Sequence, residues 1–347
     1  MNYSKRHNKF LFPALAGAIY GSTCKAENEI SNVVNYKKEE RVYSAEMENS
    51  MRAAVVDIGG TSIKSGIWEE GQIREMKETD TNAGLGGEHV MQTVLEILEC
   101  YKDFQAVGIS TAGQVDVEKG AILFANENIP GYTGMQIKER IEEKFHVPTA
   151  VQNDVNSAAI GEAHYGAGKG EPDFLCLTYG TGVGGAIVMN GEVYNGSGYS
   201  AGEFGGIVTH PEHRDPGTDI FSGCYERYAS TTALVQRVKA RFPELCNGRE
   251  IFAQMESPQV REQIDLWIAE IVYGLTTLVH IFNPALVVMG GGIMEQEYVI
   301  RKVRESLQEH IMPSFRNVRV VQAGLGNKAG MLGAAWSACR EYEKKIK

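Results

Sequence analysis

The sequence has no Cys-x-x-Cys pair and no excess of basic residues. Acidic residues outnumber basic ones 44 to 34, which gives a formal net charge of −10. This balance disfavours nucleic acid as a partner, because such binding requires a basic patch or stripe. The six cysteines are scattered, which indicates reduced thiols in a cytoplasmic protein rather than a disulfide framework. They are Cys24, Cys100, Cys176, Cys224, Cys246 and Cys339.

The first fifty residues differ in composition from the rest. Lys5, Arg6 and Lys9 precede an apolar stretch at 10–20 that contains Pro13. The stretch is too short to cross a membrane, so no membrane association is expected. It resembles a short export signal, but a dispensable tail and a regulatory segment are alternatives. We expect residues 1–50 to be a disordered extension or to lie outside the fold, which would start near Met47 or Met51.

Glycine is abundant, with 39 residues, and two glycine-rich turns each follow an apolar strand. The first occupies 53–61 and ends Asp-Ile-Gly-Gly-Thr; the second occupies 175–185 and contains Gly-Thr-Gly-Val-Gly-Gly. Glycine lets backbone N–H groups approach phosphate oxygens without a side chain in the way. Asn153 and Asp154 lie between the two turns in the sequence. The arrangement predicts a nucleotide held between two parts of the fold with a base nearby.

Strands and helices alternate from residue 52 onward, which predicts an α/β protein with mixed sheets. The two glycine turns look like one structural unit used twice. A third apolar strand that ends in a glycine turn leads into Gly290, Gly291 and Gly292. Strands are expected at 52–57, 62–68, 106–110, 148–151, 175–179, 286–289 and 318–322. Helices are expected at 87–101, 137–145, 158–165, 231–241, 260–281, 299–311 and 329–342.

These elements offer each part that phosphoryl transfer requires: phosphate donors, a divalent cation and a base for the accepting hydroxyl. Asp57 would hold Mg²⁺ through its hydration shell, and Gly290 to Gly292 would lie against the adenosine of ATP. The remaining phosphate-binding candidates are Gly59, Gly60, Thr61, Lys64, Gly180, Thr181, Gly182 and Gly184.

Asp154 is the candidate general base, and Asn153 would fix a neighbouring hydroxyl of the substrate. The alternative is that this pair only caps the helix that follows. Glu203 and Glu226 stand in glycine-rich segments, and carboxylates accept hydrogen bonds from adjacent sugar hydroxyls. Taken singly, each is equally explained as a solvated surface acid.

A metal site is a further alternative around His210, His213, Asp215 and Cys224. Their spacing fits no compact zinc site, so no structural zinc is expected.

At these residues the chain resembles the ROK family of the hexokinase–actin–Hsp70 superfamily over nearly all of 51–347. The family's phosphate motifs match 57–61 and 180–185, and its catalytic pair matches Asn153 and Asp154. Its sugar-side elements match 110–116, 128–132, 202–206 and 223–226.

The resemblance implies a two-lobed, actin-like (ribonuclease H-like) fold with the active site in the interlobe cleft. The small lobe would comprise 51–153 plus the C-terminal helix at 329–347, and the large lobe 154–328. It implies a homodimer formed through the large lobe. The implied activity is ATP-dependent phosphorylation of a hexose, at the 6-hydroxyl of a glucose-like sugar. Gly113, Asn128, Asn153, Asp154, Glu203 and Glu226 would contact the sugar.

Two departures from the family pattern matter. Gly206 replaces a histidine that, in zinc-bearing members, ligates the metal and touches the sugar near its anomeric hydroxyl. The Cys-x-Cys that supplies further zinc ligands is also missing. The resemblance therefore implies a zinc-free subgroup with space for a C1-substituted β-glucoside or an N-acetylhexosamine. A sugar-responsive transcriptional regulator and a non-catalytic sugar sensor are the alternatives. The first lacks a plausible helix-turn-helix segment here, and the second is disfavoured by the intact Asp57, Asn153 and Asp154.

Overall fold

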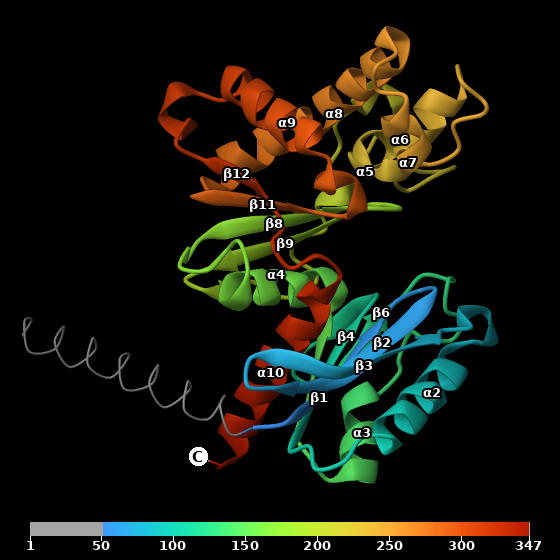
Figure 1. Ribbon diagram of the computed structural model, residues 1–347, viewed down its shortest axis with the longest axis vertical. Coiled ribbons are helices and arrows are strands. Elements are labelled where there is room, and N and C mark those ends of the chain that lie inside the picture. The colour runs from blue at the N-terminus through green and yellow to red at the C-terminus, as the bar shows by residue number, and fades with distance from the viewer. Residues whose placement is uncertain (1–50, 347) are drawn as a thin grey trace, which may run out of the picture. The chain divides into compact units, whose positions relative to one another are not determined.

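The computed structural model describes residues 51–346, so the predictions made for residues 1–50 lie outside the described residues. Two five-stranded sheets form the framework, with strand orders β3-β2-β1-β4-β7 and β10-β9-β8-β11-β12 (Figure 1). The first sheet contains β1 (Ala53–Ile58), β2 (Ser62–Glu69), β3 (Gln72–Asp80), β4 (Ala106–Thr111) and β7 (Thr149–Asn153). The second contains β8 (Phe174–Tyr179), β9 (Val183–Met189), β10 (Glu192–Val193), β11 (Leu286–Gly290) and β12 (Arg319–Gln322).

The two sheets share one topology. In each, the first two strands form an antiparallel pair across a glycine turn, β1 with β2 and β8 with β9. In each, the first strand also pairs in parallel with a later strand, β1 with β4 and β8 with β11. The prediction that the two glycine turns belong to one unit used twice is confirmed by this correspondence.

Two helices lie between the sheets and contact each other. Ala159 of α4 (Asp154–Tyr165) packs with Phe174 and Val288 of the second sheet. The C-terminal helix α10 (Ala329–Ile346) packs Met331 and Ala335 against strands of the first sheet. The helices cross closely, because a Cβ placed on Gly333 would lie 1.7 Å from the carbonyl oxygen of Ser157. The structure therefore links the two sheets through one tight helix–helix contact.

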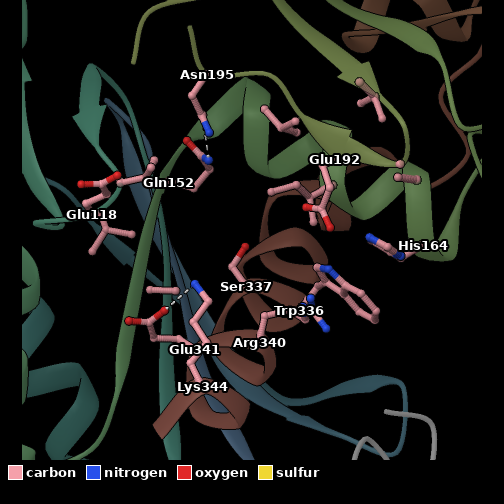
Figure 2. A pocket seen from close by; sticks show the side chains of 18 residues that line it. Glu118, Gln152, His164, Glu192, Asn195, Trp336, Ser337, Arg340, Glu341 and Lys344 are labelled. Carbon is pink, nitrogen blue, oxygen red and sulfur yellow. Dashed lines mark hydrogen bonds and ion pairs between the residues drawn. The ribbon is translucent and has the colours of Figure 1, made fainter. Parts of the chain in front are cut away.

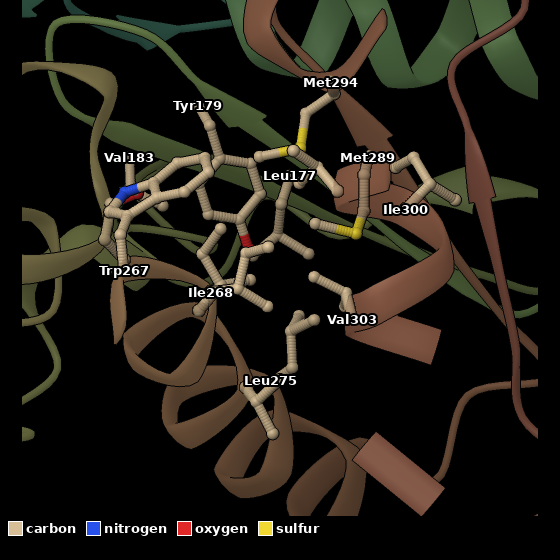
Figure 3. Close-up of a cluster of buried hydrophobic side chains, with 14 of the residues drawn as sticks. Leu177, Tyr179, Val183, Trp267, Ile268, Leu275, Met289, Met294, Ile300 and Val303 are labelled. Carbon is tan, nitrogen blue, oxygen red and sulfur yellow. The ribbon is translucent and has the colours of Figure 1, made fainter. Parts of the chain in front are cut away.

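The largest core lies between the second sheet and the helices that cover its far face. Trp267 and Leu275 of α8 (Pro258–Phe282) meet Leu177 and Met289 of the sheet, as Figure 3 shows. Within residues 51–346, α8 is the one helix long and apolar enough to cross a membrane, but half of its apolar segment is buried in the protein. Its buried face belongs to this core, which identifies it as an internal helix of a globular unit. Around it lie α5 (Glu226–Ala229), α6 (Thr231–Lys239), α7 (Gly248–Ala253) and α9 (Glu297–His310).

The first sheet has its own core. Val90, Val94 and Leu98 of α2 (Gly87–Glu99) pack at helical spacing against Val56 and strand neighbours, together with α3 (Ile137–Phe145). Most expected elements lie within three residues of the observed ones. Several elements were not predicted: the strands β3, β9 and β10, the short hairpin of β5 (Gln114–Asp116) and β6 (Ala121–Phe124), and the helices α5 and α7. β3 is mostly exposed and charged, so it lacks the apolar alternation that identifies a strand.

One predicted boundary is wrong in a way that affects the site. The expected helix start at residue 158 lies four residues too late, because α4 begins at Asp154. The sequence places polar Asn153, Asp154, Asn156 and Ser157 there, which gives no apolar periodicity. Asn153 caps the helix instead, and its Oδ1 accepts the backbone N–H groups of Val155 and Asn156.

Candidate active site

The first glycine turn joins β1 to β2 and presents Asp57 at its base. The N–H of Gly59 donates to the Ser62 carbonyl at 3.0 Å, which closes the turn. Gly60 and Thr61 are exposed at its tip. Exposed backbone donors at a tight turn are suited to phosphate oxygens.

Asp57 is half-buried and accepts a hydrogen bond of 2.6 Å from Ser110 Oγ on β4. Burial raises its pKa, an effect that the Ser110 bond and the Lys64 charge oppose. Lys64 is the register partner of Asp57 across the β1–β2 pair. The Ser110 bond holds the carboxylate in one orientation, a positioning role that the sequence analysis did not assign.

Asp154 is the first residue of α4. Its side chain is exposed to solvent in the cleft, but protein atoms around the cleft still desolvate its carboxyl group. Desolvation, with a smaller contribution from the Asp57 charge, raises its pKa from 3.8 to about 6. A carboxyl with that pKa is ionised at neutral pH and still has substantial affinity for a proton, which suits a general base.

Asn153 has two roles in the structure. Its Oδ1 caps α4, as the alternative interpretation of the pair required. Its Nδ2 donates to the carbonyl of Gly113 at 2.9 Å, which ties β7 to the loop before β5. The cap therefore fixes the first turn of α4, and with it the backbone that carries Asp154.

The second glycine turn lies against Asp154 and the two predicted sugar carboxylates. A cavity of about 460 Å³ is lined by Asp154, by the turn from Gly180 to Gly185, and by Glu203 and Glu226. A Cβ placed on Gly182 would lie 2.6 Å from Glu226 Oε2, so the turn and this carboxylate are direct neighbours. Burial and the Glu226 charge raise the pKa of Glu203. The structure thus brings together four groups that lie far apart in the sequence.

The third glycine turn, Gly290 to Gly292, lines a second cavity of about 700 Å³. Gly291 lines both cavities, so the two are adjacent. Its φ is 104°, and a Cβ there would lie 2.3 Å from the carbonyl oxygen of Tyr179, so only glycine fits. Such a large cavity beside a phosphate-type turn has room for a nucleoside.

Sequence reasoning missed several polar residues of this second cavity. Thr231, Asn247, Arg249, Gln296 and Asn327 line it from different loops and helix ends. Thr231 also fixes the glycine turn, because its N–H donates to the Gly180 carbonyl at 3.0 Å. None of these residues belongs to a glycine-rich motif, so no local signal pointed to them.

The remaining predicted residues are placed less directly. Gly113 adjoins the site through its bond with Asn153. Asn128 is exposed after β6 and does not line the cleft cavity, so its sugar contact stays a prediction. Gly206 is open, because a Cβ placed on it would have only Phe221 Cε1 within 4 Å, at 3.7 Å.

A divalent cation fits the carboxylates of the site. Asp57 and Asp154 lie close enough for the charge of one to raise the pKa of the other. Carboxylate oxygens are ligands that Mg²⁺ accepts, either directly or through water. A bound cation would relieve their repulsion.

The histidines near Gly206 are arranged differently. His210, Glu212 and His213 form a group compact enough to hold a metal ion. However, His210 Nε2 lies 2.8 Å from Glu270 and Nδ1 lies 3.0 Å from Glu212. Burial alone would lower the pKa of His210, but these two carboxylates outweigh it and raise the pKa. Both ring nitrogens are therefore used within the protein, and the His210 ring links the two acids.

Comparisons with known proteins agree with this site. The model of the ROK family matches residues 53–341. The β-glucoside kinase of Listeria monocytogenes is 32% identical over 304 residues, covering 85% of this chain and 99% of that protein. The glucokinase of Thermotoga maritima is 31% identical over 307 residues, covering 81% and 95%.

A solved structure extends the likeness to the backbone. The ROK family glucokinase of Streptomyces griseus, in complex with glucose and AMPPNP, is 31% identical and superposes with a TM-score of 0.71, covering 83% of this chain and 99% of that one. The actin-like fold predicted from the sequence is confirmed by this likeness. The motifs, the geometry of the cleft and these matches together show that the chain belongs to the ROK family.

Proposed function

We propose that this protein is an ATP-dependent sugar kinase that phosphorylates a hexose or hexose derivative, with Asp154 as the general base. The observation that carries the proposal is the shared cavity of Asp154, the second glycine turn, Glu203 and Glu226. In this cavity Asp154, whose pKa is raised, lies beside a glycine turn that would bind phosphate and two carboxylates that would bind sugar hydroxyls. The glucokinase and β-glucoside kinase relatives support the same activity.

The reaction follows from this arrangement. The backbone of the two glycine turns would hold the phosphates of ATP, and Gly290 to Gly292 would lie beside the adenosine. Asp154 would accept the proton of the sugar hydroxyl as its oxygen bonds to the γ-phosphorus. The bond between that phosphorus and the β–γ bridging oxygen breaks, and ADP leaves. When bound, Mg²⁺ would neutralise phosphate charge, and Asp57 would bind it through its hydration shell.

The two sheets would act as two lobes, the first comprising 51–153 with 329–347 and the second 154–328. Asp57 belongs to the first lobe and the cleft carboxylates Glu203 and Glu226 to the second. Closure of the lobes on a sugar would exclude water from the transferred phosphoryl group. We propose that the acceptor is the sugar hydroxyl nearest Asp154 and that this is the 6-hydroxyl of a glucose-like hexose.

The open position at Gly206 favours substrates that are larger than free glucose. No side chain fills the space beside Glu203 there, since Phe221 is the nearest group. A C1-substituted β-glucoside or an N-acetylhexosamine would use that space.

We also propose a cytoplasmic homodimer. The exposed face of α8 carries Leu266, Tyr273 and Ile281 at helical spacing, and Met312 is exposed as well. An exposed apolar stripe of this kind is typical of a protein interface. ATP as phosphoryl donor and the free cysteines among the described residues support a cytoplasmic location.

The test is a coupled ADP-release assay with Mg-ATP and a panel of glucose, mannose, N-acetylglucosamine, N-acetylmannosamine, cellobiose and simple β-glucosides. We expect turnover on at least one sugar and its loss in Asp154→Asn, with sugar binding kept. Asp103→Asn is the matched control, because Asp103 is exposed and its φ of 57° suits asparagine. Normal turnover by Asp154→Asn would remove Asp154 from the mechanism. An inactive wild type that still binds these sugars would favour a sugar sensor.

A further inference from the structure

A separate cavity of about 470 Å³ lies where α4, α10, β7 and the β9–β10 hairpin meet, and we call it the junction cavity. Figure 2 shows Gln152 and Asn195 at one end and Trp336, Ser337 and Arg340 along α10. It shares no lining residue with the two active-site cavities. Its volume is in the range of small-molecule sites.

One wall of the junction cavity is an aromatic pair. The rings of His164 and Trp336 are stacked, with centroids 3.6 Å apart and an interplanar angle of 19°. Burial, with a further contribution from Arg340, lowers the pKa of His164 to about 4, so the ring is neutral at physiological pH. A neutral aromatic wall favours the apolar face of a ligand.

The charges around the cavity disfavour an anionic ligand. The cations of α10 already have partners, since Arg340 lies 3.2 Å from Glu343 and Lys344 lies 3.1 Å from Glu341. Glu118 and Glu192 also line the cavity and form no ion pair with any residue in the range 51–346. An anion would be repelled by these two carboxylates, whereas the charges of Arg340 and Lys344 are balanced by Glu343 and Glu341.

The polar groups of the lining offer both donors and acceptors. Glu118 and Glu192 accept hydrogen bonds, whereas the Arg340 guanidinium donates and the amide of Asn195 does both. A sugar hydroxyl also donates and accepts, so a neutral polyhydroxylated ligand matches this mixture. The aromatic wall would face the C–H side of the sugar ring.

The cavity is joined to the active site by a short chain of hydrogen bonds. Gln152 is buried, and its Nε2 donates to Asn195 Oδ1 at 3.3 Å. Its Oε1 accepts the backbone N–H of Asn153 at 2.9 Å, one residue before Asp154. On the other side, the carbonyl of Asn195 accepts the N–H of Ala201, just ahead of Glu203. A ligand that binds Gln152 and Asn195 would therefore contact two residues that hydrogen-bond to the backbone next to Asp154 and to the backbone just ahead of Glu203.

We propose that the junction cavity is a second carbohydrate-binding site, separate from the phosphoryl-transfer site, whose occupancy alters turnover through Gln152 and Asn195. The binding does not depend on the proposed kinase activity. The effect on turnover rests on that proposed function.

The structure supplies a reporter for the test. The sequence has three tryptophans, and Trp68 and Trp267 are fully buried, whereas Trp336 is half-buried in the cavity wall. The full-length protein is first saturated with its turnover sugar and AMP-PNP. Glucose, maltose, cellobiose and sucrose are then titrated while tryptophan fluorescence and heat are recorded. We expect a second saturable event with one of them.

Two variants locate that event. Ser337→Phe would fill the cavity, and Glu192→Gln would remove a charge and replace one exposed acceptor oxygen with an NH2 donor, with little risk to folding. Each should weaken the second event by about tenfold or more, the effect of losing one strong hydrogen bond or more. Glu244→Gln, an exposed acid outside the cavity, is the control and should bind as the wild type does. Circular dichroism checks that each variant is folded.

The results separate this proposal from the proposed function. Binding of the first sugar with AMP-PNP reports on the active site, and only the second event reports on the junction cavity. The absence of a second event with all four sugars, or its survival in both variants, would overturn the proposal. Saturable binding of inorganic phosphate or putrescine at the cavity in place of a sugar would overturn the carbohydrate assignment. An unchanged turnover at full occupancy would refute the coupling.

Discussion

The raised pKa of Asp154 predicts a steep acid limb in the pH dependence of kcat/KM for the sugar. With a pKa of about 6, the carboxylate that accepts the proton is about half ionised at pH 6. At pH 5 about one tenth of the protein would carry the ionised base, and at pH 4 about one hundredth. With the ordinary pKa of 3.8, more than about nine tenths would still be ionised at pH 5. A measurement at pH 5 therefore distinguishes the two cases by about tenfold.

The physical reason lies in the position of the group. Desolvation is the largest cause of the raised pKa, and the Asp57 charge adds to it. The initial rate should be measured from pH 4.5 to 8.5 at saturating Mg-ATP, with the sugar below its KM. Samples held at pH 5 and returned to pH 7.5 must recover full activity, which separates titration from unfolding. A rate at pH 5 that equals the plateau would refute the assignment of Asp154 as a base with a raised pKa.

Three further predictions concern stability. Because the pKa of Asp154 is raised in the folded state, its ionisation destabilises the fold as pH rises from about 4 through about 6, so Asp154→Asn should raise Tm at pH 7.5. That gain should vanish at pH 4; an equal gain at both pH values would argue against the raised pKa. Gly291→Ala should cost more than about 2 kcal/mol in urea unfolding and weaken AMP-PNP binding, whereas Gly292→Ala, with open space around it, should leave the free energy of unfolding nearly unchanged. The raised pKa of His210 stabilises the fold at low pH, and this contribution is lost as pH rises through the folded-state value. His210→Gln should therefore lower Tm more at pH 6 than at pH 9, and a pH-independent loss would exclude the ionic link to Glu212 and Glu270.

Much of the fold could be predicted because its signals are local. An apolar strand that ends in Asp-x-Gly-Gly or Thr-x-Gly-Thr-Gly contains its own turn, so Asp57 and Gly180 were located from the sequence alone. The strands β1 and β2 on either side of the first glycine turn were predicted from the same short segments, whereas β9, which pairs with β8 after the second turn, was not. Weakly apolar elements such as β3 were missed, because sheet neighbours rather than periodicity stabilise them.

The sequence by itself determined the chemical groups of the site: the glycine turns, the acids at 57, 154, 203 and 226, and the polar pair at 153–154. The tertiary structure alone decided which of them meet. It made Asn153 a helix cap and placed Glu226 against Gly182. It also gathered Asn247 and Arg249 at the second cavity and formed the junction cavity from four separate elements. The reason is physical: residue type sets what a group can donate or accept, whereas its distance to partners and its desolvation depend on chain segments far away in the sequence.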